Sequence, residues 1–310
     1  AAMPPRRVCD DDDDKEEDTG IFGDESAFRK RFVVPIANAR EPDADAETKA
    51  KGKASQAELA DLAKRFVLRR ENTLNAIHLP PKLVQVLCCR MGDAQRQAYR
   101  ALIDDKHLQH ALAGKQSDVL GYVQKLMKIC NHPGLVNEQN STKNEAESAK
   151  LLVLTRLMRQ MRRDKASERI VIVANATSIL DVIAKLCDRE GWPWCLLDGS
   201  TATKKRKELN ESFNDPNENH FAFLLSSTAG GCGLNLIGAN RLVLFDQSWN
   251  PATDKQAAAR CWRDGNKRDC FTYRLVTTGT IEEKIFQRQL QKEGLKGVVE
   301  DKDQLIAFAS

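Results

Sequence analysis

The second half of the chain alternates short apolar runs with amphipathic stretches of helix length, and this alternation constrains the fold more than any other feature. The runs occupy residues 170–173, 195–197, 221–225, 241–245 and 272–276. Continuous apolar runs separated by helices indicate parallel strands that are covered on both faces. We therefore predict an α/β fold, an open parallel sheet with helices on both faces. Ligands of such sheets bind at the carboxyl ends of the strands, so the residues after each run are the first site candidates.

The first half has a different pattern, which predicts mostly helical structure. Apolar residues recur at roughly helical spacing across residues 21–80 and again across 95–129. Residues 84–89 follow the Pro80-Pro81 break and predict one strand. Residues 10–18 read DDDDDKEED, a block that cannot bury apolar area, so we expect residues 1–20 to be an acidic disordered tail.

Composition narrows the class of protein without revealing a partner. Lys plus Arg (48) barely exceeds Asp plus Glu (44), so a nucleic-acid site would have to be local. The nine cysteines include no C-x-x-C pair, and their odd number favours a reducing compartment over a disulfide framework. No window approaches the roughly 18 apolar residues of a spanning helix, so we expect a soluble intracellular protein without a membrane partner.

A glycine-rich segment follows the third apolar run. Residues 226–236 read SSTAGGCGLNL, with three glycines in four positions. Glycines let the backbone approach a ligand closely, and the hydroxyls of Ser226, Ser227 and Thr228 are natural donors to phosphate oxygens. A tight strand-to-helix turn would account for the glycines equally well. By itself, the segment leaves both interpretations open.

Two arginines follow the fourth run at helical spacing. We expect a helix that begins near Ala252 and presents Gln256, Arg260 and Arg263 on one face. Two guanidinium groups held there could complement the charge of a transferring phosphoryl group, which is the arginine-finger role. The alternative is a solvated arginine face that forms ion pairs with Asp254 or Asp264.

Two further sets of side chains are His107, His110, Cys130 and His132, and Trp192 with Trp194. The spacings of the first set match no standard zinc site, so we predict no metal site and expect His132 to pack under a helix end. The two tryptophans flank a proline just before a strand, where packing is the expected use rather than base stacking.

Several strings together resemble the Swi/Snf-type DNA translocases of helicase superfamily two. Residues 224–251 resemble motif V and its extension, 256–267 resemble motif VI, and 169–174 with 197–201 resemble the opening strand and the LDG-type motif of the second RecA-like lobe. Residues 19–23, 28–32, 66–70, 128–133 and 278–285 look most like the recombination-repair translocases of the Rad-fifty-four type. The resemblance covers residues 19–295.

The resemblance implies three sets of functional positions. Asp198, Gly199, Thr201, Ser226, Ser227, Thr228 and Gly230 would face DNA phosphates. Gly233, Asn235, Gln256, Arg260 and Arg263 would face the nucleotide, with Arg263 the first choice as the finger and Arg260 the second. Asp246, Trp249 and Asn250 would couple the two sites, and residues 280–289 would brace lobe two against lobe one.

The resemblance also implies an organisation and a function. Residues 21–149 would hold the end of lobe one and a helical protrusion, 150–279 a RecA-like lobe two, and 280–310 the brace helix and tail. Enzymes of this type bind double-stranded DNA, hydrolyse ATP with Mg²⁺ to move along it, and remodel recombinase-coated joints in the nucleus. Double-stranded DNA and a recombinase filament are therefore the expected partners, and the nucleus is the expected location.

The sequence departs from that family in one respect. A working site needs a G-x-x-x-x-G-K-[ST] loop and an acidic pair for magnesium, and the Gly-Lys pairs at Gly52 and Gly114 do not match this pattern. Residues 24–27 (DESA) mimic an acidic box in the wrong place. We therefore expect a fragment that begins late in lobe one and uses ATP and Mg²⁺ only with a complementing lobe one. The alternative is a non-catalytic DNA-binding module derived from such an enzyme.

Overall fold

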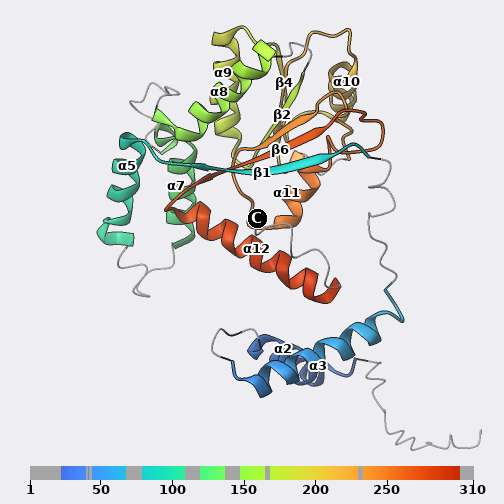
Figure 1. The fold of residues 1–310 in the computed structure, drawn as a ribbon. Helices are drawn as coiled ribbons and strands as arrows, with labels where there is room; N and C mark the ends of the chain where they lie inside the picture. Colours follow the sequence, from blue (N-terminus) through green and yellow to red (C-terminus); the bar gives the residue numbers. More distant parts are fainter. Residues whose placement is uncertain are drawn as a thin grey trace, which may run out of the picture. The chain divides into compact units, whose positions relative to one another are not determined.

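The structure, a computed structural model, describes residues 22–39, 41, 44–67, 79–108, 119–136, 147–164, 168–229 and 233–300, the last eight without side-chain detail. The chain divides into two compact units, and the division follows Glu71 (Figure 1). Each unit is described by itself. The predicted acidic tail at residues 1–20 lies outside the described residues.

The first unit is helical. Its elements are α1 (Glu25–Phe28), the π-helix η1 (Arg29–Val33), α2 (Val34–Asn38) and α3 (Ala46–Ala63). Asp24 and Asp45 cap α1 and α3 by accepting hydrogen bonds from backbone amides three residues later. Gly52 lies inside α3, where an added Cβ would come within 2.2 Å of the Ala39 Cβ, so this glycine serves helix packing and not phosphate binding. The Gly114-Lys115 pair lies outside the described residues.

The second unit is built on one parallel sheet. Its strands are β1 (Lys82–Cys89), β2 (Ile170–Ala174), β3 (Trp194–Leu197), β4 (Ala222–Ser226), β5 (Arg241–Leu244) and β6 (Cys270–Thr277). They lie in the order β1-β6-β5-β2-β4-β3, and each neighbouring pair is parallel. The predicted parallel sheet is confirmed. The strand predicted after Pro81 is also present, and it joins this sheet beside β6, a pairing that the sequence analysis did not predict.

Helices cover the sheet and extend from its ends. They are α5 (Asp93–Ile103), α7 (Val119–Asn131), the 3-10 helix η2 (Pro133–Leu135), α8 (Ala149–Asp164), α9 (Thr177–Glu190), α10 (Thr203–Asn214), α11 (Pro251–Ala258) and α12 (Ile281–Glu300). Helix α7 ends at Asn131, as predicted from the proline that follows His132. Among the described residues, no helix is long and apolar enough to cross a membrane.

The central strand β2 shows why both faces of the sheet are covered. Ile170 and Ile172 belong to one buried cluster, together with side chains of α8 and α9. Val171 and Val173 belong to a second cluster on the opposite face, together with Phe213 of α10 and residues of α11. Alternate side chains of a strand point to opposite faces, so a continuous apolar run requires cover on both.

The two tryptophans of the sequence analysis pack, as predicted. Trp192 lies edge-on against Phe221 with 5.6 Å between ring centroids, and the Trp194 Nε1 donates a hydrogen bond to Asp188 at 2.7 Å. His132 is buried, and its Nδ1 accepts a hydrogen bond from the Gly134 amide at the start of η2.

Candidate nucleic-acid and nucleotide site

Polar residues gather at the carboxyl edge of the sheet. Asn175 follows β2, Asp198 follows β3, and Ser227 follows β4. Asp246 lies two residues beyond the end of β5. Because the strands are parallel, all of these positions lie at one edge, where sheets of this class bind ligands.

The loop after β4 is anchored at its base and exposed further along. The Ser227 amide donates to the Ala174 carbonyl at 3.0 Å, and the Ser227 Oγ donates to the Asn175 Oδ1 at 2.6 Å. The hydroxyls of Ser226 and Thr228 are 2.9 Å apart, and Thr228 is exposed. The loop therefore presents hydroxyl groups on a fixed backbone. Gly230, which the sequence analysis placed against DNA, lies outside the described residues.

The loop after β3 is held together by Asp198. Its Oδ1 accepts hydrogen bonds from the amides and hydroxyls of Ser200 and Thr201, at distances from 2.7 to 3.1 Å. These bonds, those of Ser200 first, lower the pKa of the Asp198 carboxyl. The Arg206 side chain also stabilises the loop, because it donates hydrogen bonds to the carbonyls of Thr201, Asp198 and Gly199. Asp198 thus shapes the loop, while Gly199 is exposed on it.

Cations lie next to this loop. The first turns of α10 carry Lys204, Lys205 and Lys207, all of which are exposed. Lys207 lies 3.8 Å from Glu211, an exposed pair that contributes little. The two loops at this edge contribute neutral donors, so these lysines supply the local positive charge that the overall composition does not indicate.

The arginines occupy a turn, which corrects the predicted helix. Helix α11 ends at Ala258, so of the three predicted residues only Gln256 is on it. The chain leaves the helix because the Arg260 carbonyl accepts from the Leu236 amide at 3.0 Å instead of from a later helical amide. Asn266 stabilises the turn, since its Nδ2 donates to the Cys261 and Ala239 carbonyls. The spacing predicts a helix because no glycine or proline occurs between Ala252 and Gly265.

This turn meets the end of the glycine-rich segment. Gly233 has a φ of 64°, in the left-handed region that favours glycine, and its carbonyl accepts from the Arg263 Nη1 at 3.5 Å. The Asn235 carbonyl accepts from the Asn214 side chain at 2.6 Å, while the Asn235 Oδ1 is buried without a hydrogen-bond partner among the described residues. Gly233, Arg260 and Arg263 therefore converge, whereas Gln256 is exposed two residues before the end of α11.

The alternative ion pair with Asp254 is not formed. Asp254 is buried, and its Oδ2 accepts from Arg274 at 2.6 Å and from the Gln289 Nε2 at 2.8 Å. Burial raises the pKa of this carboxyl, against the lowering effect of Gln289 and Arg274. Gln289 belongs to α12, so Asp254 fastens α11 to α12.

Trp262 was missed by the sequence analysis. It lies between the two arginines in the chain, and its Nε1 donates to the Pro80 carbonyl at 2.8 Å. The Lys82 ammonium lies 4.8 Å from the centroid of its ring. Trp262 thus ties the arginine turn to the start of β1. A large aromatic residue among charged residues indicates that the side chain packs against another part of the protein. The sequence does not reveal the partner, because it is about 180 residues earlier in the chain.

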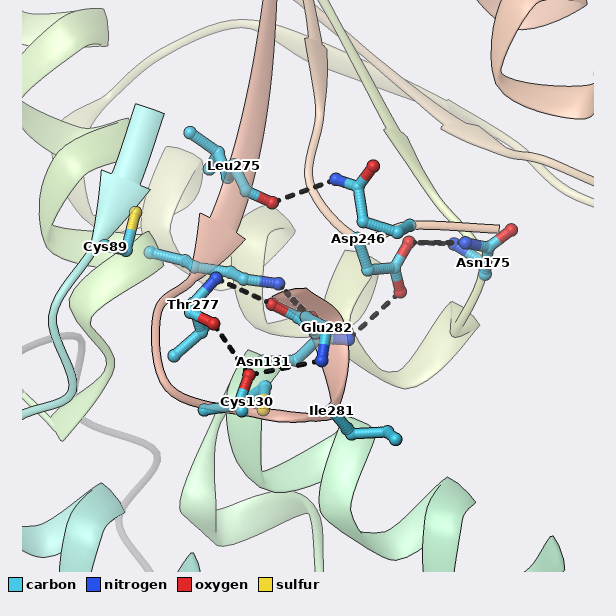
Figure 2. Close-up of polar contacts among 12 residues, drawn as sticks. Cys89, Cys130, Asn131, Asn175, Asp246, Leu275, Thr277, Ile281 and Glu282 are labelled. Carbon is cyan, nitrogen blue, oxygen red and sulfur yellow. Dashed lines mark hydrogen bonds and ion pairs between the residues drawn. The ribbon is translucent and has the colours of Figure 1, made fainter. Parts of the chain in front are cut away.

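Asp246 is the centre of a buried polar cluster (Figure 2). Its Oδ1 accepts from the Asn175 amide at 2.7 Å and from the Asn175 Nδ2 at 2.9 Å, and its Oδ2 accepts from the Asn131 Nδ2 at 3.0 Å. Trp249 is exposed, and Asn250 caps α11 by accepting from the Ala252 amide at 3.1 Å. The coupling role expected of these three residues stays a prediction.

A fully buried ion pair lies beside this cluster and was also missed. Lys150 of α8 pairs with Glu282 of α12, and both side chains are 0% exposed. The Lys150 Nζ also donates to the Asn131 Oδ1 at 3.1 Å, and the Glu282 Oε2 accepts from the Thr277 amide at 3.0 Å. Each residue looks like an ordinary solvated charge in the sequence, so only the fold reveals the pair.

Comparison with known proteins agrees with this geometry. The model of the SNF2-related domain matches residues 18–135, and that of the helicase conserved C-terminal domain matches residues 149–265. The chain is an SNF2-related protein. The two matched regions are separated by residues 136–148, whereas the compact units divide after Glu71. The predicted bounds of the two lobes stay a prediction.

Individual relatives extend the match over most of the chain. Protein CHROMATIN REMODELING 25 of Arabidopsis thaliana is 45% identical over 315 residues, which cover 91% of this chain and 34% of that protein. DNA repair and recombination protein RAD54 of Oryza sativa subsp. japonica is 43% identical, covering 91% of this chain and 32% of that protein. The chain therefore spans about a third of the length of these relatives.

A solved structure supports the fold. The C-terminal part of the Fun30 ATPase domain superposes with a TM-score of 0.59 at 25% sequence identity, covering 68% of this chain and 90% of that one. The RecA-like fold expected from the resemblance is confirmed by this likeness together with the observed parallel sheet.

Proposed function

We propose that this chain supplies the second motor lobe of an ATP-dependent double-stranded DNA translocase that acts in recombinational DNA repair or chromatin remodelling. One observation carries the proposal. The segment 226–236 begins at the sheet edge with the hydroxyl-bearing residues 226–228. At its other end, Gly233 and Leu236 form hydrogen bonds with the turn that holds Arg260 and Arg263. A DNA site and a nucleotide site on the two ends of one short segment can influence each other mechanically.

The DNA side of the proposal rests on backbone chemistry. Ser226, Ser227, Thr228 and Gly230 would contact phosphates, together with the loop of Asp198, Gly199 and Thr201. In this arrangement Asp198 acts by shaping its loop, because a carboxylate repels phosphate and its Oδ1 already accepts four hydrogen bonds. Lys204, Lys205 and Lys207 would add the cations. Such contacts predict weak, salt-sensitive binding that is independent of base sequence.

The nucleotide side rests on the arginine turn. Arg263 is exposed and would reach the transferring phosphoryl group of ATP across the cleft to a complementing first lobe, with Arg260 as the second choice. Gly233, Asn235 and Gln256 would face the nucleotide. The complementing first lobe would hold the Mg²⁺.

The relatives suggest a place of action. Proteins whose names include DNA repair and recombination match nine-tenths of this chain, which supports a nuclear role on duplex DNA with a recombinase filament as a further partner. A second candidate is a non-catalytic DNA-binding module. One observation favours it, because Gly52-Lys53, a Gly-Lys pair that the structure describes, lies inside a packed helix and not in a phosphate-binding loop.

The test is ATP hydrolysis by the purified chain, with and without duplex DNA, alone and mixed with a separately expressed first lobe of an SNF2-related relative. We expect hydrolysis only in the mixture, and its loss by about a thousandfold in Arg263→Ala. Lys267→Ala, which removes an exposed cation from the same turn, is the matched control and should retain activity. A mixture that binds DNA but hydrolyses nothing would favour the binding module.

A further inference from the structure

A continuous series of hydrogen bonds, partly buried at the loop and buried further in, links the loop after β4 to the start of α12. On the loop side, the Ser227 Oγ donates to the Asn175 Oδ1 at 2.6 Å. The Asn175 Nδ2 in turn donates to the Asp246 Oδ1 at 2.9 Å. Ser227 is only half-buried, whereas Asp246 is 4% exposed, so the series runs from the surface into the interior.

On the helix side, the series ends at the base of α12. The Lys150 ammonium pairs with Glu282, and the second carboxylate oxygen of Glu282 accepts from the Thr277 amide at 3.0 Å. The Thr280 hydroxyl donates to the Thr277 carbonyl at 2.7 Å and accepts from the Glu282 amide at 3.2 Å. The ion pair therefore fixes the turn by which β6 passes into α12.

Asn131 joins the two sides. Its Nδ2 donates to the Asp246 Oδ2 at 3.0 Å, and its Oδ1 accepts from the Lys150 Nζ at 3.1 Å. Within the part of the chain that the structure describes, it alone bonds to both Asp246 and Lys150. Figure 2 marks the bond between Asn131 and Asp246 with a dashed line. Its own backbone is held by Ser148, whose Oγ donates to the Asn131 carbonyl at 2.6 Å.

The hydroxyl of Ser227 makes this series responsive. A serine has one hydroxyl hydrogen, and here it is donated to Asn175, so the same hydrogen is not available to a phosphate. A phosphate that recruits it leaves the Asn175 Oδ1 without its donor, and the balance of bonds around Asp246 changes. In a low-dielectric interior, linked hydrogen bonds polarise one another, so the change extends along the series.

We propose that Asn131 is a positioning residue that transmits DNA contact at the Ser227 loop to the base of α12. The inference rests on the proposed function, because it takes the loop after β4 as a DNA-contacting loop. Asn131 touches neither DNA nor nucleotide and acts through Asp246 and Lys150. A merely structural Asn131 would fasten α7 to the sheet and would carry no response to DNA.

The test is hydrogen exchange of single amides in the full chain, with and without a short blunt DNA duplex at low ionic strength. Two amides report on the two sides, that of Ser227, which donates to Ala174, and that of Thr277, which donates to Glu282. In the unsubstituted chain we expect DNA to change exchange at both. At Thr277 the change should be at least about fivefold, the lower end of typical coupling between sites.

Asn131→Ala should keep the response at Ser227 and lose the response at Thr277. The paired variant Asn131→Asp with Asp246→Asn should restore it, because the two side chains then exchange donor and acceptor while total charge is conserved. Leu154→Ala is the control for lost stability, since Leu154 is buried on the same helix as Lys150 but outside the series. This control should retain both responses.

Two results would overturn the inference. One is a response at Ser227 without any at Thr277 in the unsubstituted chain, and the other is a Thr277 response that survives Asn131→Ala. If Asn131→Ala fails to fold, Asn131→Asp alone, which keeps the side-chain volume but removes the donor to Asp246, must lose the Thr277 response instead. An absence of DNA binding, with no response at Ser227 either, would be a separate result that refutes the proposed function and this inference with it.

Discussion

Breaking the Lys150–Glu282 pair should cost more than replacing both partners. Both side chains are 0% exposed, so Lys150→Met leaves the Glu282 carboxylate buried with the Thr277 amide as its one remaining donor among the described residues. Removing one partner of a buried pair typically costs about 3–5 kcal/mol, and we expect this cost for Lys150→Met and for Glu282→Gln. A domain of ordinary stability, about 5–15 kcal/mol, would lose about a fifth of its stability or more.

The double variant should lose only about 1–3 kcal/mol, the cost of hydrogen bonds left unmade, because no charge remains without its partner. The assay is urea unfolding followed by tryptophan fluorescence. All four tryptophans, at positions 192, 194, 249 and 262, lie in the second unit, so the signal reports on that unit alone. As a control, Leu154→Ala combined with Glu282→Gln should show additive losses. Single losses below about 1 kcal/mol, or a double loss equal to the sum of the singles, would refute this account of the pair.

Three further predictions follow from other parts of the molecule. Asp198→Ala should weaken DNA binding several-fold in fluorescence anisotropy, because the loop loses the hydrogen bonds that Ser200 and Thr201 donate to Asp198. Tighter binding would show instead that repulsion between the Asp198 carboxylate and DNA phosphates dominates. Trp262→Ala should lower the rate of ATP hydrolysis by the reconstituted mixture at saturating ATP, because the substitution removes the hydrogen bond between the arginine turn and Pro80. DNA affinity should stay within about twofold, and an equal loss of hydrolysis and DNA affinity would contradict this prediction. Burial raises the pKa of the Cys187 and Cys195 thiols to about 12 from 9.0. The folded state therefore holds these protons where the unfolded chain releases them. The contribution of these thiols to the free energy of unfolding should be constant below about pH 9 and fall above it, and Cys187→Ala should reduce that fall in urea unfolding.

The sheet was predictable because its signal is local. A strand buried on both faces must be apolar throughout, as β2 and β4 are, and the helices between the strands supply the parallel crossovers. The positions of the loop residues followed from the same reasoning, since the carboxyl ends of parallel strands share one edge. Ser227 and Asn175 therefore lie together, as a site at this edge requires.

The end of α11 and the buried polar series were not predictable from spacing. Arg260 and Arg263 have helical spacing, but the helix ends before them. The Leu236 amide donates to the Arg260 carbonyl, and the Ala239 carbonyl accepts from Asn266, so distant backbone groups hold the turn. Lys150 and Glu282 are 132 residues apart, and each is followed by apolar or charged neighbours that suit a helix surface. Pairing between residues so far apart leaves no trace in a single sequence.

The pairing of β1 with β6 has a consequence for how the chain is made. β1 is an edge strand whose Leu83, Val84 and Val86 are each at least 39% exposed, and its neighbour in the sheet is β6, completed only at Thr277. About 180 residues separate the two, so at ordinary rates of synthesis β1 waits roughly 10–40 s for its partner on the ribosome. During that interval the backbone of β1 has no partner strand, and its apolar side chains are exposed. Such a segment is the kind that chaperones for extended chains bind.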